Sequence, residues 1–341
     1  MRILKFLFIP LLFFLYGCGA DITINQKEVL FEIKKGESIQ TVSRRLKHEN
    51  IINNPLRFQI LAKLMRKDSN LKYGVYLITR EEKYADIINK FSKGATYSIK
   101  VTIPEGSNIY QIADILLQKE LVKKEDFLKE CGNKKFLARY NLPQNATLEG
   151  YLYPDTYMIP LNYPVEKIIE MFLDKFDQIV DQKYIDEINK RGLTLQKILT
   201  MASIIEKEAK LEYEKPIIAG VYYNRLKQKI KLQADPTLIY ALILKGEYTG
   251  DIRYRDFTLD SKYNTYKYYG LPPSPIANPG KTSILAAIYP ADVDYLYFVA
   301  RPDGSHQFSK TLKEHNQAVY QYQKLPAIER RKKRIESLSG Q

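Results

Sequence analysis

The amino-acid sequence predicts an α+β protein in which small β-strands accompany a larger number of helices. Three features indicate this class: an uncharged first segment, a strand-and-helix unit that occurs twice, and a helical second half that ends in a strand. At 341 residues the chain has room for two or three domains. We therefore expect an N-terminal anchor, one or two small β-α-α modules, and a larger, mostly helical domain with a small sheet.

The first segment has the pattern of an export signal or a membrane anchor. Arg2 and Lys5 precede an uncharged, apolar run at residues 6–20. The run is shorter than the roughly 20 residues that a full membrane span needs, and "LYGC" at residues 15–18 resembles a lipoprotein cleavage site. Residues 1–20 are therefore predicted to be a lipoprotein signal or a single-pass anchor, and both remain open. Either one places the rest of the chain on the extracytoplasmic side of the cell inner (cytoplasmic) membrane.

The chain is basic, with a net charge of +14 at pH 7. Such a charge suits an anionic partner, for example nucleic acid, a membrane surface or a cell-wall polymer. The densest basic block, "RRKKR" at residues 330–334, lies in a predicted solvated tail at residues 323–341. No RNA-binding, zinc-finger or helix-turn-helix pattern accompanies it, so we do not expect a nucleic-acid partner.

A unit of strand, glycine turn and helix occurs twice, at residues 31–46 and 101–116, with a constant offset of 70. In each copy a polar residue, Ser38 or Asn108, stands where the cap of an amphipathic helix is expected, and a second helix start follows. The aligned pairs are Phe31 and Val101, Ile33 and Ile103, Gly36 and Gly106, Ile39 and Ile109, Val42 and Ile112, and Leu46 and Leu116. We assign residues 29–96 to a first module and residues 97–145 to a second copy that leads into the larger domain.

Helical patterns dominate from about residue 146 onward. Helices are predicted within residues 164–192, 194–210, 215–228 and 235–246, and a strand at residues 295–300 precedes a turn and a last helix. Residues 263–283 are rich in tyrosine and proline, and long ordered loops of this kind often carry function. We assign residues 146–322 to one domain.

Several kinds of reactive site are excluded. The histidines, His48, His306 and His315, have no metal-ligand spacing, and Cys131 has no histidine near it in sequence. The stretch "PIANPGKTS" resembles half of a phosphate loop, but Pro275 stands where that pattern requires glycine. We therefore expect no metal, nucleotide or other cofactor, which leaves carboxylates as the candidate reactive groups.

Two acids, Glu206 and Glu208, end an otherwise apolar helix for which Thr194 is the predicted cap. At about 100° per residue, Glu206 falls on the apolar face, and Glu208 lies roughly 200° further round, so the two cannot share a pocket. We expect Glu208 at the solvent border near Lys197. Glu206 would lie among apolar side chains, where lost hydration raises the pKa of its carboxyl and suits it to act as a general acid. The alternative for Glu206 is an ordinary ion pair with Lys207, Lys210 or Arg225.

Six motifs, in the same order along the chain, carry a resemblance to a known family. They are "LEGYLYPDTY", "MASIIEKE", "VYYNRL", "LQADPTLIYAL", "YNTYKYYGLPPSPIANPG" and "YLYFVARPDGSHQFSKTLKEHNQAV". Together they closely resemble the endolytic murein transglycosylase (YceG-like) family, from about Phe31 to the last helix. The resemblance implies a membrane-anchored N-terminus, a LysM-like module at residues 29–96 and a YceG-like catalytic domain at residues 146–322. Whether the LysM-like module binds sugar or is a spacer stays open.

The resemblance further implies a lyase, a peptidoglycan lytic transglycosylase. Such an enzyme cleaves the β-1,4 bond between N-acetylmuramic acid and N-acetylglucosamine within nascent strands, leaves a 1,6-anhydro end and ends strand elongation. One glutamate acts first as acid and then as base, and the likeness of "MASIIEKE" makes Glu206 the candidate. No water, second carboxylate or cofactor takes part. Peptidoglycan strands are the expected partner, and peptidoglycan synthases are candidate partners.

The remaining motifs are interpreted as walls of a sugar cleft. The residues predicted to bind substrate are Glu149, Gln233, Asp235, Tyr263, Asn264 and Thr265. Glu149 would orient the substrate or brace Glu206, and a structural role is the alternative for each of the six. Two other functions stay open: a non-catalytic peptidoglycan-binding envelope protein, and a lysozyme-type hydrolase acting in the same cleft.

Overall fold

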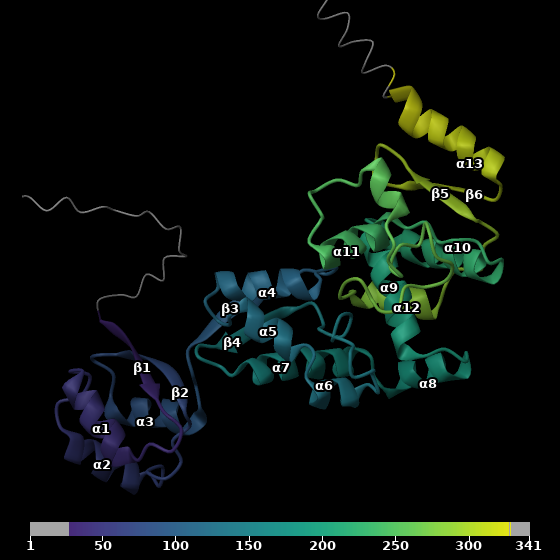
Figure 1. Cartoon of the computed structure of the whole chain (residues 1–341). Helices are drawn as coiled ribbons and strands as arrows, with labels where there is room; N and C mark the ends of the chain where they lie inside the picture. The colour runs from purple at the N-terminus through teal and green to yellow at the C-terminus, as the bar shows by residue number, and fades with distance from the viewer. Residues whose placement is uncertain (1–26, 327, 329–341) are drawn as a thin grey trace, which may run out of the picture. The chain divides into compact units, whose positions relative to one another are not determined.

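The computed structural model describes residues 27–326 and residue 328, so the predicted anchor at residues 1–20 and most of the basic tail lie outside the described residues. The chain divides into two compact units after Tyr97, and each is described by itself (Figure 1). Among the helices of the described part, none combines the length and the apolar character needed to cross a bilayer.

The N-terminal unit is a two-stranded antiparallel sheet with helices packed on it. Strand β1 (Glu28–Ile33) pairs with β2 (Gly74–Thr79), and Phe31 lies opposite Tyr76. The helices are α1 (Ile39–His48), α2 (Pro55–Leu64) and α3 (Tyr84–Lys93). The Ser38 side chain caps α1 by accepting a hydrogen bond from the Thr41 amide, and Gly94 ends α3 in the left-handed conformation at φ +71°. The predicted strand, Ser38 cap, helix and second helix start of the first copy are therefore confirmed.

The second copy of the repeat opens the other unit and has the same local structure. It consists of β3 (Ser98–Thr102), α4 (Ile109–Gln118) and α5 (Lys124–Glu130), with Asn108 and Gln111 forming a capping box at α4. All the apolar side chains that were aligned between the two copies are buried. Strand β3 pairs with β4 (Thr156–Pro160), and the buried side chains of this copy share one continuous core with the helices that follow. The second copy is therefore an integral part of the larger unit.

The middle of the larger unit is helical, as predicted. Its elements are α6 (Lys134–Arg139), α7 (Val165–Ile179), α8 (Gln182–Lys190), α9 (Leu195–Glu208), α10 (Lys215–Lys227), α11 (Asp235–Lys245) and α12 (Lys281–Ile288), with short 3₁₀ turns at Glu212–Glu214 and Tyr254–Thr258. The stretch 164–192 forms two helices because Asp181 caps a new one with its side chain. Helix α12 was not predicted, since the proline-rich loop before it hides its start.

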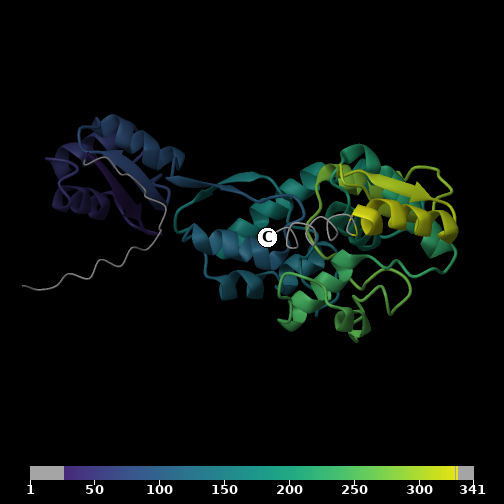
Figure 2. The ribbon, with the colours of Figure 1, turned by 90° about the horizontal axis from the view of Figure 1, so that it is seen from above.

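The end of the unit is a small β-hairpin covered by a helix. Strand β5 (Tyr297–Ala300) pairs with β6 (His306–Ser309), and α13 (Leu312–Val319) continues into a π-helical turn at Tyr320–Lys324. The hairpin and α13 lie side by side (Figure 2). Strand β6 was missed, because residues 301–319 were expected to be a turn and a helix only.

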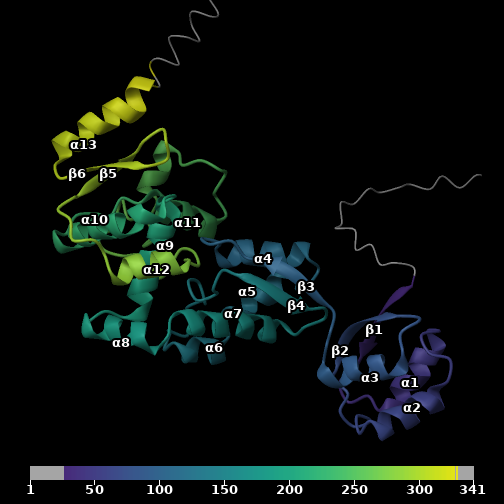
Figure 3. The same cartoon turned by 180° about the vertical axis from the view of Figure 1, so that it is seen from behind.

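Helix α9 is the centre of the larger unit, with α8, α10, α11 and α12 around it (Figure 3). Thr194 caps it as predicted, by accepting a hydrogen bond from the Lys197 amide. Every residue from Ile198 to Ile205 is buried, so the helix has no solvent face along this stretch. The prediction of one apolar and one polar face is therefore wrong for α9, and this changes the surroundings of both of its acids.

Candidate active site

Glu206 is held in a network of protein contacts. Its carboxylate accepts hydrogen bonds from the Gly280 amide at 3.0 Å and from Ser283 Oγ at 2.6 Å. Lys215 Nζ lies 3.5 Å from the other carboxylate oxygen, and the side chains of Glu206 and Lys215 are only 9% and 5% exposed. The expected apolar surroundings of Glu206 are thus wrong, because a lysine and two hydrogen-bond donors contact its carboxylate.

The glycine turn before α12 explains why Glu206 is bound there. The Gly280 amide is at the helix N-terminus, where unpaired amides attract a negative charge. Glu105 packs so closely that a Cβ on Gly280 would lie 2.0 Å from its carboxylate. Burial, and next the charge of Glu206, raise the pKa of the Glu105 carboxyl. The half phosphate loop noted in the sequence therefore serves to hold a carboxylate of the chain itself.

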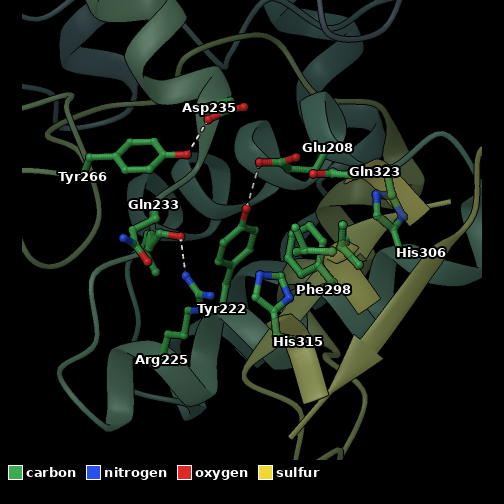
Figure 4. A pocket seen from close by; sticks show the side chains of 14 residues that line it. Glu208, Tyr222, Arg225, Gln233, Asp235, Tyr266, Phe298, His306, His315 and Gln323 are labelled. Atoms are coloured by element: carbon green, nitrogen blue, oxygen red, sulfur yellow. Dashed lines mark hydrogen bonds between the residues drawn. The ribbon is translucent and has the colours of Figure 1, made fainter. Parts of the chain in front are cut away.

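Glu208, the last residue of α9, lines a cavity of about 400 Å³. Its carboxyl accepts a hydrogen bond from the Tyr222 hydroxyl at 3.0 Å (Figure 4). Burial raises the pKa of Glu208 to about 7, against the opposing effect of the Tyr222 hydrogen bond. The predicted position of Glu208 at a solvent border near Lys197 is wrong. Helix α10 packs on α9, and residues of the C-terminal hairpin line the same cavity as Glu208, so this side of α9 is enclosed as well.

The cavity is built by segments that are far apart in the sequence. Its walls come from the end of α9, from α10, from the start of α11, from β5 and β6, and from α13 and the turn after it. The lining side chains are Glu208, Tyr222, Arg225, Leu232, Gln233, Asp235, Tyr266, Phe298, Val299, Ala300, His306, His315, Val319 and Gln323. Because Gln233, Asp235 and Gln323 are exposed, the cavity opens to solvent.

Two of the predicted binding residues, Gln233 and Asp235, lie in this cavity with Glu208. Gln233 has a backbone φ of +49°, which is uncommon for a residue with a side chain. The Asp235 carboxylate accepts a hydrogen bond from the Tyr266 hydroxyl (Figure 4). The negative charge of Asp235 is a further cause of the raised pKa of Glu208. Gln233 and Asp235 therefore share a cavity with Glu208, and of the two only Asp235 contributes to the raised pKa of Glu208.

Three other predicted residues, Tyr263, Asn264 and Thr265, support the loop that carries Tyr266. Asn264 is fully buried and donates hydrogen bonds from its amide nitrogen to the carbonyls of the turn before it. Thr265 is 1% exposed, and its hydroxyl accepts a hydrogen bond from the Ala234 amide at 3.0 Å. The Tyr263 hydroxyl is hydrogen-bonded to Ser274 at 2.6 Å. None of the three is among the residues that line the cavity around Glu208. Their hydrogen bonds fit the structural alternative, and their contact with substrate stays a prediction.

Glu149 is buried, with 1% exposure. Its carboxyl accepts hydrogen bonds from the Ile109 amide at 3.2 Å, from Tyr240 at 2.9 Å and from Asn278 at 3.0 Å. Burial outweighs these donors and raises the pKa of Glu149 to about 8. These contacts fit the structural alternative, and substrate contact by Glu149 stays a prediction. Because Asn278 lies two residues before Gly280, Glu149 fixes the turn that binds Glu206.

Other residues that line the cavity, among them His306 and Arg225, could not be recognised as site residues from the sequence. His306 Nδ1 lies 2.7 Å from the carboxylate of Glu214, which is 2% exposed and also accepts the His306 amide at 2.8 Å. Arg225 donates to the carbonyls of Leu296 and Leu232, so it joins β5 to the loop before α11. The pairing of His306 with Glu214 spans 92 positions, so no local spacing could reveal it. Within the described residues, no cluster of three or more His, Cys, Asp or Glu is arranged to bind a metal.

Known proteins resemble this chain over most of its length. Residues 31–321 match the YceG-like family. The chain is 36% identical over 329 residues to a Bacillus subtilis protein named endolytic murein transglycosylase, covering 91% of this chain and 89% of that one. A Streptococcus pneumoniae protein of the same name is 30% identical over 327 residues, covering 87% of this chain and 59% of the relative. The crystal structure of a putative YceG-like protein from Listeria monocytogenes is 39% identical, with a TM-score of 0.59, and the match covers 85% of this chain and 99% of that one. The chain therefore belongs to the YceG-like family.

Proposed function

We propose that this chain is an endolytic murein transglycosylase, a lyase that cleaves the β-1,4 bond between N-acetylmuramic acid and N-acetylglucosamine within peptidoglycan strands. Two relatives with this name cover most of the chain, and the YceG-like match runs from residue 31 to residue 321. The observation that carries the proposal is Glu208, a carboxyl with a pKa of about 7 in an open cavity. Acting on nascent strands, the enzyme would end their elongation.

Glu208, and not Glu206, is the general acid in this proposal. A general acid must hold a proton near neutral pH and must reach the substrate. Glu208 meets both conditions, because burial raises its pKa and its side chain lines the cavity. Glu206 is ion-paired with Lys215 and accepts a hydrogen bond from the Gly280 amide at the start of α12. It does not line that cavity.

The cleavage needs one carboxyl group. Glu208 gives its proton to the bridging oxygen as the bond between that oxygen and C1 of N-acetylmuramic acid breaks. The resulting carboxylate then takes the proton of the C6 hydroxyl of the same sugar, and O6 bonds to C1 to close the 1,6-anhydro ring. Glu208 ends the cycle protonated, and no water is consumed. The Tyr222 hydroxyl, which donates to one Glu208 oxygen, positions the carboxyl and leaves the second oxygen for the substrate.

The other lining residues suit a polysaccharide. Gln233 and Asp235 present amide and carboxylate groups at the exposed rim, where they can bind sugar hydroxyl and N-acetyl groups. Tyr266 and Phe298 contribute aromatic surface to the walls. This mixture of a few polar groups with aromatic side chains is typical of ligand sites, and its openness to solvent fits a long strand.

The location of the enzyme is part of the proposal. The apolar run at residues 6–20 would tether the chain to the cytoplasmic membrane, as a lipoprotein or as a single-pass protein, with both units on the extracytoplasmic side. The N-terminal unit is proposed to be LysM-like, and peptidoglycan synthases are proposed partners. The net charge of +14 fits this environment of anionic lipids and wall polymers.

Mass analysis of the products tests the proposed function. Uncrosslinked glycan strands incubated with the purified chain are expected to give shorter strands with 1,6-anhydro-N-acetylmuramic acid ends, because the C6 hydroxyl replaces water as the nucleophile. Products heavier by one water would identify a hydrolase. Saturable binding of peptidoglycan with no change in strand length would identify a non-catalytic wall-binding protein. Either result contradicts the proposal.

A further inference from the structure

Helix α2 of the N-terminal unit carries an exposed aliphatic stripe. Leu56, Ile60 and Leu64 are 65%, 53% and 76% exposed, and their spacing of four residues places them on one face of the helix. The opposite face is buried in the core of the unit through Phe58 and Ala62. Large aliphatic side chains scattered singly over a surface are normal, but three in register along one helix mark an interaction site.

Basic side chains border this stripe on both sides. At about 100° per residue, Arg57 and Lys63 lie roughly 60° to either side of Ile60, just outside the aliphatic residues. Both are exposed. Helix α2 contains no Asp or Glu. Long basic side chains beside an aliphatic face can extend toward phosphate groups while their carbon chains stay on the apolar surface. The exposed face of the helix thus combines aliphatic and basic side chains, the two kinds of group that a surface of anionic lipid attracts.

The charge of the whole N-terminal unit also favours a surface of anionic lipid as the partner. Between Lys27 and Tyr97 the sequence has 15 Lys or Arg and 8 Asp or Glu, a net charge of +7. Half of the net charge of the chain, +14, therefore belongs to this smaller unit. Basic residues near a surface of anionic lipids are attracted by its negative potential, and each adds to the binding.

The chain also holds this unit close to a bilayer. The apolar run ends at Ala20 and β1 begins at Glu28, so only residues 21–27 separate them. Seven residues span at most about 25 Å when fully extended. If the run is in the membrane, the unit cannot leave the membrane surface, and weak docking by one helix becomes effective because it is intramolecular. A free protein partner would have no such advantage.

We propose that α2 docks the N-terminal unit on anionic lipid, with Leu56, Ile60 and Leu64 at the boundary of the acyl chains and Arg57 and Lys63 at the phosphates. This inference rests on the proposed membrane tether. It does not depend on the identity of the catalytic acid. It assigns the unit a second point of membrane contact, in addition to the tether.

The natural chain contains no tryptophan, so a single introduced tryptophan reports its own surroundings. The full chain with Ile60→Trp, reconstituted in vesicles of phosphatidylglycerol and phosphatidylcholine, is expected to show blue-shifted emission and strong quenching by brominated lipids. Leu64→Trp provides a second, independent reporter on the same stripe. Tyr254→Trp is the matched control, because Tyr254 is 93% exposed in the other unit and should stay unquenched.

The charge pattern gives a further test in the Ile60→Trp background. Adding Arg57→Gln and Lys63→Gln, or using phosphatidylcholine alone, should lower the quenching several-fold while the protein still floats with the vesicles. Flotation of the Ile60→Trp and Leu64→Trp proteins without any quenching would overturn the docking and leave the tether intact. A chain that does not float at all would overturn both, whereas the enzymatic proposal is judged separately by the mass of the products.

Discussion

A Glu208→Gln substitution is expected to lower the rate of anhydro-product formation by about 10²–10⁴-fold, the usual contribution of a general acid. Glutamine has the same shape and can still accept the hydrogen bond from Tyr222, so the cavity should keep its structure. It has no proton to give to the bridging oxygen and no carboxylate to receive one from the C6 hydroxyl. Product release from uncrosslinked strands under single-turnover conditions measures the loss.

The matched control for this prediction is Glu206→Gln on the same helix. Glutamine at this position keeps an acceptor for the Gly280 amide and for Ser283, and it lies outside the cavity lining. The folded Glu206→Gln protein should therefore retain activity to within about tenfold of the natural chain. If Glu206→Gln is inactive while Glu208→Gln turns over normally, the acid has been assigned to the wrong residue.

A Glu206→Ala substitution is expected to lower the free energy of unfolding by about 3–5 kcal/mol, the usual cost of removing one partner of a buried ion pair. The change leaves the Lys215 ammonium, 5% exposed, without its carboxylate. It also leaves the Gly280 amide and the Ser283 hydroxyl without their acceptor. Urea unfolding followed by circular dichroism measures the loss.

The partner substitution Lys215→Met, alone and combined with Glu206→Ala, separates the free energy of the ion pair from that of the other contacts of each residue. Lys215 also donates to Thr282 at 2.7 Å, so its loss alone should destabilise the protein too. Removing both charges together should cost less than the sum of the two single changes, with a coupling of about 0.5–3 kcal/mol between residues in contact. Strictly additive losses would show that Glu206 and Lys215 do not stabilise one another.

Much of the fold could be predicted because its signals are local. The caps at Ser38, Asn108 and Thr194 each depend on a side chain a few residues from the amide that it accepts. The repeat could be recognised in the sequence because both copies have apolar residues at the same positions, and these residues are buried in both. Helix α12 and strand β6 were missed, since a proline-rich loop and a turn gave no periodic pattern before them.

The candidate site was harder to predict than the fold. The "MASIIEKE" motif drew attention to both acids, but periodicity alone cannot choose between them when a helix is buried on every side. Glu206 is bound by Gly280 and Ser283, more than 70 positions away, and Glu208 lines a cavity built by distant segments. Both differences depend on long-range packing. Similarly, the sequence could not show that Asn264 and Thr265 form hydrogen bonds within the chain while the neighbouring Tyr266 lines the cavity.

The most direct test of the account is the pKa of the Glu208 carboxyl, measured by ¹³C NMR of glutamate-labelled protein. The natural chain should show a carboxyl signal that titrates at about 7 and is missing from the Glu208→Gln protein. Because only the protonated acid can start the cleavage, kcat/KM should fall about tenfold for each pH unit above that value. A Glu208 signal that titrates near the ordinary value of 4.5, or a signal near 7 that disappears with Glu206→Gln instead, would contradict the account.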